Sequence, residues 1–147
     1  MADPVRVPGD HTMIGSPLGE MTPAQALRAD AIRDVGCLAC RLRFPAIEHV
    51  PCEIHHLTIG GRHGQKRRGH DETIGFCTWH HRGESDKPDK ARLRRWLGPS
   101  YAREPAAFRE DFGDDDFLLM AQNELLAAYR AATSIHPACG GAENDPD

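Results

Sequence analysis

The chain has 147 residues, with 39% hydrophobic, 27% charged and only 6% aromatic side chains, and its formal net charge is −4. This length fits one domain and leaves no room for two full cores. No run approaches the roughly 18 apolar residues of a membrane span, and the first residues lack the basic end and apolar block of a secretory signal. We therefore expect a cytoplasmic protein, in which cysteines serve as metal ligands or catalysts more often than in disulfides.

Metal-ligating residues and charges cluster along the chain. Seven of the nine histidines lie between residues 49 and 81, and four of the five cysteines lie between residues 37 and 77. Residues 36–103 hold 13 Lys and Arg against 7 Asp and Glu, whereas residues 104–147 hold 2 against 10. The centre of the chain is therefore basic and rich in metal ligands, and its C-terminal part is acidic.

The N-terminal part predicts a loose arm followed by a helix. Residues 1–21 contain Pro and Gly throughout and show no apolar period, so we expect them to be disordered. Thr22 can cap a helix, Pro23 fits its first position, and Gln25 completes a capping box. Gly36 then ends this helix.

The central part predicts two strands on either side of a long loop. The short mixed runs of residues 41–56 predict a hairpin that ends at Cys52–Leu57. Residues 58–72, with four Gly and four Lys or Arg, form a long basic loop of the kind that usually carries function. Thr73–Phe76 is a short second strand, after which residues 77–82 turn into a short helical segment.

Two further helices complete the predicted domain, which spans residues 22–133. Lys90–Leu97 forms a basic helix that ends at Gly98. Asp114–Asp116 begin a second helix, where their charges oppose the positive end of its dipole. Residues 134–147 form a frayed tail. These elements predict a small and irregular α+β fold.

Two pairs of residues have the spacing of a tetrahedral zinc site. Cys37 and Cys40 flank a tight turn, and Cys77 and His80 have the same two-residue gap. The alternative is that the cysteines are small buried apolar residues and that His80 is a satisfied core histidine. We favour a structural zinc, because bound zinc contributes on the order of 10 kcal/mol to folding and this chain has few large apolar residues.

The adjacent pairs His55-His56 and His80-His81 indicate a second role for histidine. On a strand, neighbouring side chains point to opposite faces, so His55 and His56 are not expected to bind the same ion. One of the two would bind a divalent cation that keeps open coordination positions, and the other would take a proton from water.

Glu53-x-His55-His56, a loop, a short strand and Cys77-x-x-His80-His81 together resemble the ββα-metal motif of HNH endonucleases. The closer resemblance is to the Ref-like group, the phage recombination-enhancement nucleases that act with RecA. The strong part of the match lies within residues 37–83, and a weaker part extends to residues 98–100 and 112–126. The resemblance implies a zinc-stapled ββα-metal (HNH) core with flanking helices.

The same resemblance implies an activity and its partners. The protein would be a DNA endonuclease that hydrolyses phosphodiester bonds with Mg²⁺ or Mn²⁺ and takes part in phage or bacterial recombination. Cleavage in this group can require a RecA filament on single-stranded DNA. A phage-encoded protein of this kind would act in the cytoplasm of the bacterial host.

The resemblance also implies individual residue roles. The second histidine of the HNH pair is the general base, which corresponds to His56. His55 and His81 would be ligands of the catalytic cation. The middle position of the motif, often Asn, falls here on His70 or Asp71.

Further ligands and contacts follow from the same resemblance. Glu53 would orient an imidazole from behind the metal ligands, and Arg82 or a cation of the loop would hold the phosphate. Cys52, His63 and His70 could share a second zinc with one of the paired histidines. The alternative is that Cys52 is a buried thiol and that His63 contacts phosphate, so the chain would hold one zinc or two.

A basic cluster on the Gly-rich loop indicates contact with the DNA backbone. Its members are Arg62, Lys66, Arg67 and Arg68, which are followed along the chain by Arg82, Arg92, Arg94 and Arg95. Phosphate contacts carry no sequence information, so we expect weak sequence preference. The alternative is a solvated charged loop, which the position between the two histidine pairs makes less favoured.

A different class of function also fits these residues. The chain could be a non-catalytic, zinc-stabilised DNA-binding module, in which every histidine is structural or contacts phosphate. Metal analysis would then find zinc alone, and no divalent ion would support nicking. We favour the endonuclease because the zinc half-sites occur together with separate histidine pairs. The sequence predicts no particular oligomeric state.

Overall fold

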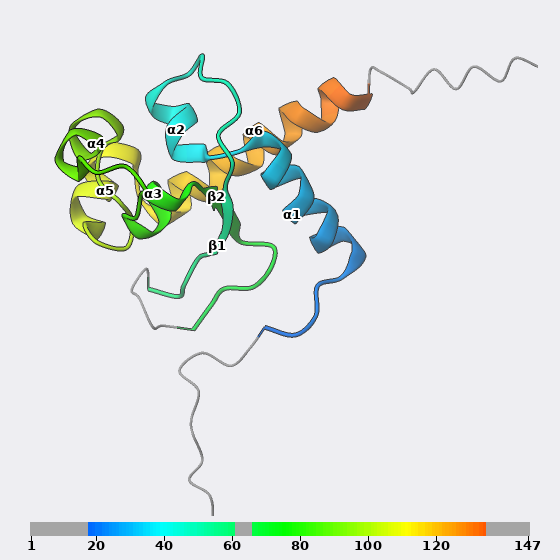
Figure 1. Cartoon of the computed structure of the whole chain (residues 1–147). Coiled ribbons are helices and arrows are strands. Elements are labelled where there is room, and N and C mark those ends of the chain that lie inside the picture. Colours follow the sequence, from blue (N-terminus) through cyan, green and yellow to red (C-terminus); the bar gives the residue numbers. More distant parts are fainter. Residues whose placement is uncertain (1–17, 61–65, 135–147) are drawn as a thin grey trace, which may run out of the picture.

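The computed structural model describes residues 18–60 and 66–134, which form a small α+β fold with six helices and a two-stranded sheet (Figure 1). The elements in chain order are α1 (Pro23–Val35), α2 (Leu38–Arg43), β1 (Glu53–His56), β2 (Thr73–Phe76), α3 (Thr78–Arg82), α4 (Lys90–Leu97), α5 (Pro105–Phe112) and α6 (Asp115–Ser134). None of the helices in these residues is long and apolar enough to cross a membrane. Most of the predicted arm and tail lies outside the described residues.

Helix α1 begins and ends as the sequence predicts. The Thr22 hydroxyl accepts a hydrogen bond from the Gln25 amide at 3.2 Å, and the Gln25 side chain accepts one from the Thr22 amide at 3.0 Å. Gly36, with a φ of 86°, follows the last turn in the left-handed region that favours glycine. Ile32 is fully buried on the inner face of the helix, where it packs with Leu126 of α6.

The predicted hairpin within residues 41–56 was wrong. The chain continues from the first cysteine pair into α2, because the Arg41 amide donates to the Cys37 carbonyl at 3.2 Å and the Phe44 amide donates to the Cys40 carbonyl at 2.8 Å. The CxxC turn is thus the first turn of a helix. Strand β1 pairs with β2 and not with the segment that precedes it.

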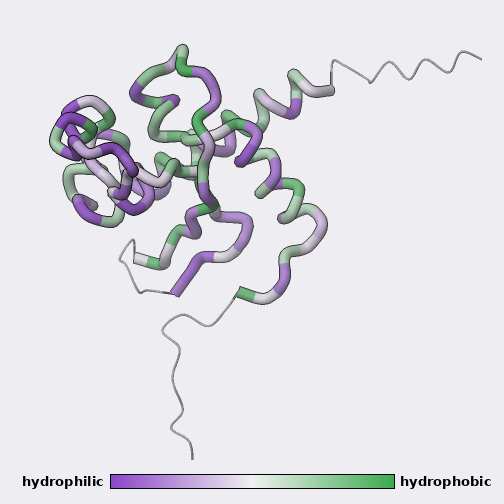
Figure 2. Tube along the Cα trace, in the orientation of Figure 1, coloured by the Kyte–Doolittle hydropathy of each residue, from purple (hydrophilic) through white to green (hydrophobic). Residues whose placement is uncertain are grey.

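The two strands pair in antiparallel fashion across the long loop that connects them. The register places His55 of β1 opposite Ile74 of β2, and an isolated bridge between Thr58 and Arg67 continues the pairing beyond the strands. In Figure 2, the described part of the loop that leads into β2 is mainly hydrophilic. The prediction of a polar, basic loop between two short strands is therefore confirmed for the part of the loop that the structure describes.

The main core lies where α2, α5 and α6 meet the sheet. Phe76 of β2, Phe108 of α5 and Leu118 of α6 are fully buried, and the rings of Phe76 and Phe108 have centroids 5.4 Å apart. Each such side chain contributes about 1.5–3 kcal/mol by leaving water. Helix α5 was not predicted, although Pro105 occupies its first position. This helix closes the core on the side of the cysteines.

Helix α1 packs closely against β2 at Gly75. A Cβ atom at this position would lie 2.7 Å from Cγ2 of Ile32 and 2.8 Å from Sγ of Cys52. The Gly75 amide donates to the buried Gln122 side chain of α6 at 2.9 Å, so β2 is held between two helices at this residue. Glycine is required here by the close approach of neighbouring side chains.

We expect Gly75→Ala to lower the free energy of unfolding by about 1–3 kcal/mol, because the added methyl group must displace buried side chains. Urea unfolding followed by far-UV circular dichroism measures this change. Gly19→Ala is the matched control, since a Cβ at Gly19 meets nothing within 4 Å. Equal stability of the two variants would contradict the close packing of α1 on β2.

Candidate metal centre and active site

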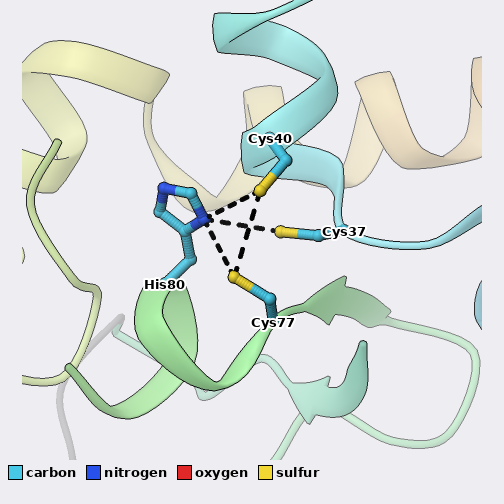
Figure 3. Close-up of side chains that lie close together, drawn as sticks. All are labelled: Cys37, Cys40, Cys77 and His80. Atoms are coloured by element: carbon cyan, nitrogen blue, oxygen red, sulfur yellow. Dashed lines mark hydrogen bonds between the residues drawn. The ribbon is translucent and has the colours of Figure 1, made fainter. Parts of the chain in front are cut away.

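Four side chains from two distant segments converge between α2 and α3 (Figure 3). The ligand atoms of Cys37, Cys40, Cys77 and His80 all lie within 4.8 Å of one another. The Cys40 and Cys77 sulfurs are 4.0 Å apart, and Nδ1 of His80 lies 3.2–3.5 Å from the three sulfurs. The predicted set of four ligands is therefore brought together.

These distances fit a tetrahedral zinc. Bonds of about 2.3 Å to sulfur and about 2.1 Å to nitrogen place two sulfurs about 3.8 Å apart and a sulfur and the nitrogen about 3.6 Å apart. The far nitrogen of His80, Nε2, lies 2.9 Å from the Leu97 carbonyl, which can only accept. In the neutral ring this bond leaves the Nδ1 lone pair toward the sulfurs, as a metal ligand requires. The cluster could hold a zinc ion.

Without a cation, it is unfavourable for all three cysteines of this cluster to be thiolates at once. Burial raises the pKa of Cys37 to about 12, and hydrogen bonds to Cys37 and Cys77 are the main reason that the pKa of Cys40 is also raised. The pKa of Cys77 is lowered instead, chiefly because the other two thiols donate to its sulfur. A bound dication would stabilise all three thiolates together, which is the chemistry of a Cys3His zinc site.

A second group of polar side chains lies at the junction of β1 and α3. Nδ1 of His55 lies 3.1 Å from Nε2 of His81, and Nδ1 of His81 lies 2.7 Å from Oε2 of Glu53. The same carboxylate oxygen accepts from Arg82 at 2.9 Å. Because the carboxylate accepts a hydrogen bond from Nδ1–H of His81, the Nε2 lone pair of the neutral ring faces His55. Glu53 thus orients an imidazole, as the sequence predicts.

The separation of these two nitrogens has a chemical meaning. Ligand atoms about 2.1 Å from an octahedral cation lie about 3.0 Å apart when they occupy adjacent positions. The 3.1 Å between His55 and His81 is close to this value. A divalent cation could therefore be held by both rings, with its remaining positions available to water or phosphate.

Tyr101 packs against the ring of His55 and is itself hydrogen-bonded to Asp115. The centroids of the Tyr101 and His55 rings are 4.6 Å apart, and the Tyr101 hydroxyl donates to Oδ1 of Asp115 at 2.8 Å. Asp115 is 5% exposed at the start of α6. This contact fixes one face of the His55 ring against the protein and connects it to the long C-terminal helix.

His56 is directed to a different partner from His55. Its Nε2 lies 3.1 Å from Nδ1 of His70, and Nε2 of His70 donates to the Gly19 carbonyl at 2.7 Å. Burial lowers the pKa of His56, and the positive charge of Arg67 lowers it further, which favours the neutral form of the ring. The structure places His70 next to His56, whereas Asp71 contacts Gln25.

Two candidate residues have other contacts. The Asp71 carboxylate accepts from the Gln25 side chain of α1 at 2.9 Å. The Cys52 thiol is half-buried and directed at the Ile32 carbonyl, 3.5 Å away, and burial raises its pKa to about 11. Among the described residues, Cys52 and His70 do not join a third ligand in a metal-binding group. His63 lies outside the described residues.

The basic residues differ in their exposure and in their ion pairs. Lys66 and Arg67 are exposed on the loop, and Arg82 is 53% exposed beside Glu53. Arg68 instead pairs with Asp116 of α6 at 2.8 Å and donates to the Thr58 carbonyl at 3.1 Å. Arg68 therefore fastens the loop to α6. Arg62, which was also predicted to contact DNA, lies outside the described residues.

The comparison with protein families covers both groups of ligands. Residues 21–127 match the family described as recombination enhancement, RecA-dependent nuclease. The chain belongs to this family. Searches of the curated proteins and of the solved structures find no significant match. The sequence resemblance to the recombination-enhancement nucleases is therefore confirmed at the level of the family, and the protein is a nuclease that acts on nucleic acid in recombination.

Some residues around the candidate site of this RecA-dependent nuclease were missed by the sequence analysis. Tyr101 and Asp115 support His55, and the Gly19 carbonyl holds His70. Asp115 was assigned to the charged start of a helix, although it is buried. The weak match at residues 112–126 includes Asp115, and the one at residues 98–100 ends directly before Tyr101, whereas nothing in the sequence analysis indicated Gly19.

We expect Cys37→Ser to lose zinc and to unfold the domain, because it removes one of the four converging ligands. Elemental analysis and thermal unfolding measure the two effects. Cys52→Ser is the matched control, since Cys52 stands outside the cluster, and it should keep one zinc per chain. A second zinc equivalent that disappears in Cys52→Ser would instead support the alternative site with His63 and His70.

Proposed function

We propose that this nuclease is a metal-dependent DNA endonuclease of the HNH type, which hydrolyses phosphodiester bonds and carries a separate structural zinc. The observation that supports the proposal best is the division of two adjacent histidines between two partners. His55 faces His81 at 3.1 Å, and His56 faces His70 at 3.1 Å. A strand delivers this division because neighbouring side chains point to opposite faces.

His55 and His81 are the ligands that we propose for the catalytic cation, Mg²⁺ or Mn²⁺. When bound, the cation supplies a positive charge that stabilises the phosphate and the departing oxygen. Glu53 accepts a hydrogen bond from Nδ1–H of His81 and so turns the ligand nitrogen, Nε2, toward His55. Tyr101 limits the rotation of His55 by lying against its ring.

His56 is the general base in this proposal. A neutral imidazole takes a proton from the attacking water, and burial favours the neutral form of this ring. His70 stands in the middle position of the HNH motif in place of Asn. Its contact with His56 holds the base, while the Gly19 carbonyl holds His70 in turn.

The DNA backbone is the ligand that we propose for Lys66, Arg67 and Arg82. All three are exposed, and Arg82 is the one adjacent in sequence to the metal ligand His81. Their contacts would be electrostatic and indifferent to sequence. A RecA filament on single-stranded DNA is the partner implied by the family, and the bacterial cytoplasm is the compartment in which the two would meet.

We expect His56→Ala to reduce cleavage of plasmid DNA in Mg²⁺ or Mn²⁺ by about 100- to 10,000-fold, because the proton acceptor is lost. Nicking is measured with and without RecA, alongside thermal unfolding and duplex binding, both of which should be unchanged. His49→Ala is the matched control, since His49 is exposed and its ring contacts the Arg33 carbonyl at 2.9 Å. Retained nicking in His56→Ala would refute the assignment and favour the non-catalytic binding module.

We expect Glu53→Gln to raise the Mn²⁺ concentration needed for half-maximal cleavage by about 10- to 100-fold. The neutral amide lacks the negative charge with which the carboxylate accepts from both His81 and Arg82. Titration of cleavage rate against Mn²⁺ separates this effect from a loss of maximal rate. Glu48→Gln on the exposed segment before β1 should match the parent protein, and an unchanged titration in Glu53→Gln would argue against His81 as a ligand.

A further inference from the structure

Helix α4 is the one described helix in which no residue is buried. Trp96 near its end is 60% exposed, whereas Trp79 is 9% exposed and donates its indole N–H to the Gly98 carbonyl at 3.0 Å. An exposed large aromatic ring forfeits the free energy of burial. The core does not account for the position of Trp96.

A groove of about 780 Å³ lies beside this ring. Its lining includes Lys87, Arg92 and Arg95, which are exposed and form no ion pair among the described residues. The lining carboxylate, Asp89, is occupied as the cap of α4, where it accepts from the Arg92 amide at 2.8 Å. The groove therefore combines an open aromatic ring with three exposed cations against one carboxylate, which leaves a net positive lining.

The ring is held in place before any partner arrives. Trp96 lies against Phe44, with ring centroids 5.7 Å apart, and its carbonyl accepts from Nε of Arg43 at 2.6 Å. Arg94 pairs with Glu104 at 2.7 Å, so this arginine is held by the fold and not by the groove. The aromatic ring thus loses little conformational freedom on binding.

We propose that this groove binds single-stranded DNA, with a base stacked on Trp96 and phosphates on Lys87, Arg92 and Arg95. A polyanion matches the charge of the groove. Every unpaired base offers a flat face to an aromatic ring, whereas bases within a duplex already cover one another. The inference rests on the proposed action on DNA and adds that the enzyme binds an unpaired strand outside its catalytic centre.

The groove is connected to the active site through the zinc cluster. The Leu97 carbonyl at the end of α4 accepts from His80, and His81, the next residue of α3, faces His55. A strand held on α4 is therefore fixed to the same rigid unit that presents the proposed metal ligands. This arrangement would favour cleavage of DNA that carries an unpaired segment next to a duplex.

The test is the binding of a fluorescently labelled 20-nucleotide oligothymidylate, followed by anisotropy without added Mg²⁺ or Mn²⁺ so that no cleavage occurs. We expect Trp96→Leu to raise the Kd roughly 5- to 150-fold, with a smaller effect for Trp96→Phe, which keeps a ring. Binding should quench the tryptophan fluorescence of the parent protein but not that of Trp96→Phe, whose remaining tryptophan is buried. A duplex of equal length should lose less affinity.

The charged residues give an independent readout. The double variant Arg92→Gln, Arg95→Gln should lower the slope of log affinity against log salt by about 1.4, since each phosphate contact on a single strand contributes about 0.7. Arg130→Gln, at an exposed position of α6, and Leu27→Ala, which removes an exposed side chain of α1, are the matched controls. Both controls should bind like the parent protein.

Two outcomes would overturn the inference. One is unchanged oligothymidylate binding in Trp96→Leu; if that variant also loses cleavage only in the presence of RecA, the surface binds a protein instead. The other is an equal loss of affinity for single strand and duplex. His56→Ala should still bind the oligonucleotide, so a failure of cleavage with intact Trp96-dependent binding would count against the catalytic proposal and not against this one.

Discussion

The convergence of four metal ligands is the constraint on which the candidate active site depends. Cys37 and Cys40 come from the start of α2, and Cys77 and His80 come from the start of α3. The contact between these two distant segments holds α3 beside β1. A zinc ion bound to the four side chains would strengthen this contact in a small fold with few large apolar residues. His81 is the next residue after His80, so the contact that places one imidazole among the cysteines also places its neighbour against His55.

Three histidines of this nuclease each have one ring nitrogen bonded to an acceptor oxygen. Nε2–H of His80 donates to the Leu97 carbonyl, Nε2–H of His70 donates to the Gly19 carbonyl, and Nδ1–H of His81 donates to Glu53. An acceptor on one ring nitrogen keeps the proton there and leaves the lone pair on the other. In His70 and His81 this contact turns the other ring nitrogen toward the neighbouring histidine, which lowers the reorganisation needed for binding. Burial lowers the pKa of His80, but hydrogen bonds to Cys40 and Cys77 outweigh it and raise this pKa to about 9, so a cation bound to Nδ1 would displace a proton there.

The sequence predicted those features that depend on local chemistry. The capping box of α1, the strand Thr73–Phe76 and the paired ligand spacings are written in a few adjacent residues and were confirmed. The hairpin in residues 41–56 was wrong because the pairing partner of β1 lies beyond a long loop. The contacts of Arg68 with Asp116 and of Tyr101 with His55 were beyond reach, since they depend on how α6 and the segment after α4 fold back over the sheet.

The cluster of Cys37, Cys40, Cys77 and His80 also links the candidate active site to the surface of α4. The bond from His80 turns the Leu97 carbonyl inward and anchors the last turn of that helix, while Trp96, one residue earlier, is rotated by about 100° around the helix axis. The group that bonds to the interior and the ring that faces solvent thus belong to adjacent residues. On β1, the adjacent residues His55 and His56 likewise face different partners. Disruption of this cluster would therefore disturb both the paired histidines and the exposed ring, whereas a change at Trp96 would leave the cluster intact. If α4 binds an unpaired strand as we propose, this asymmetry would allow that binding to be altered independently of the chemistry proposed for β1.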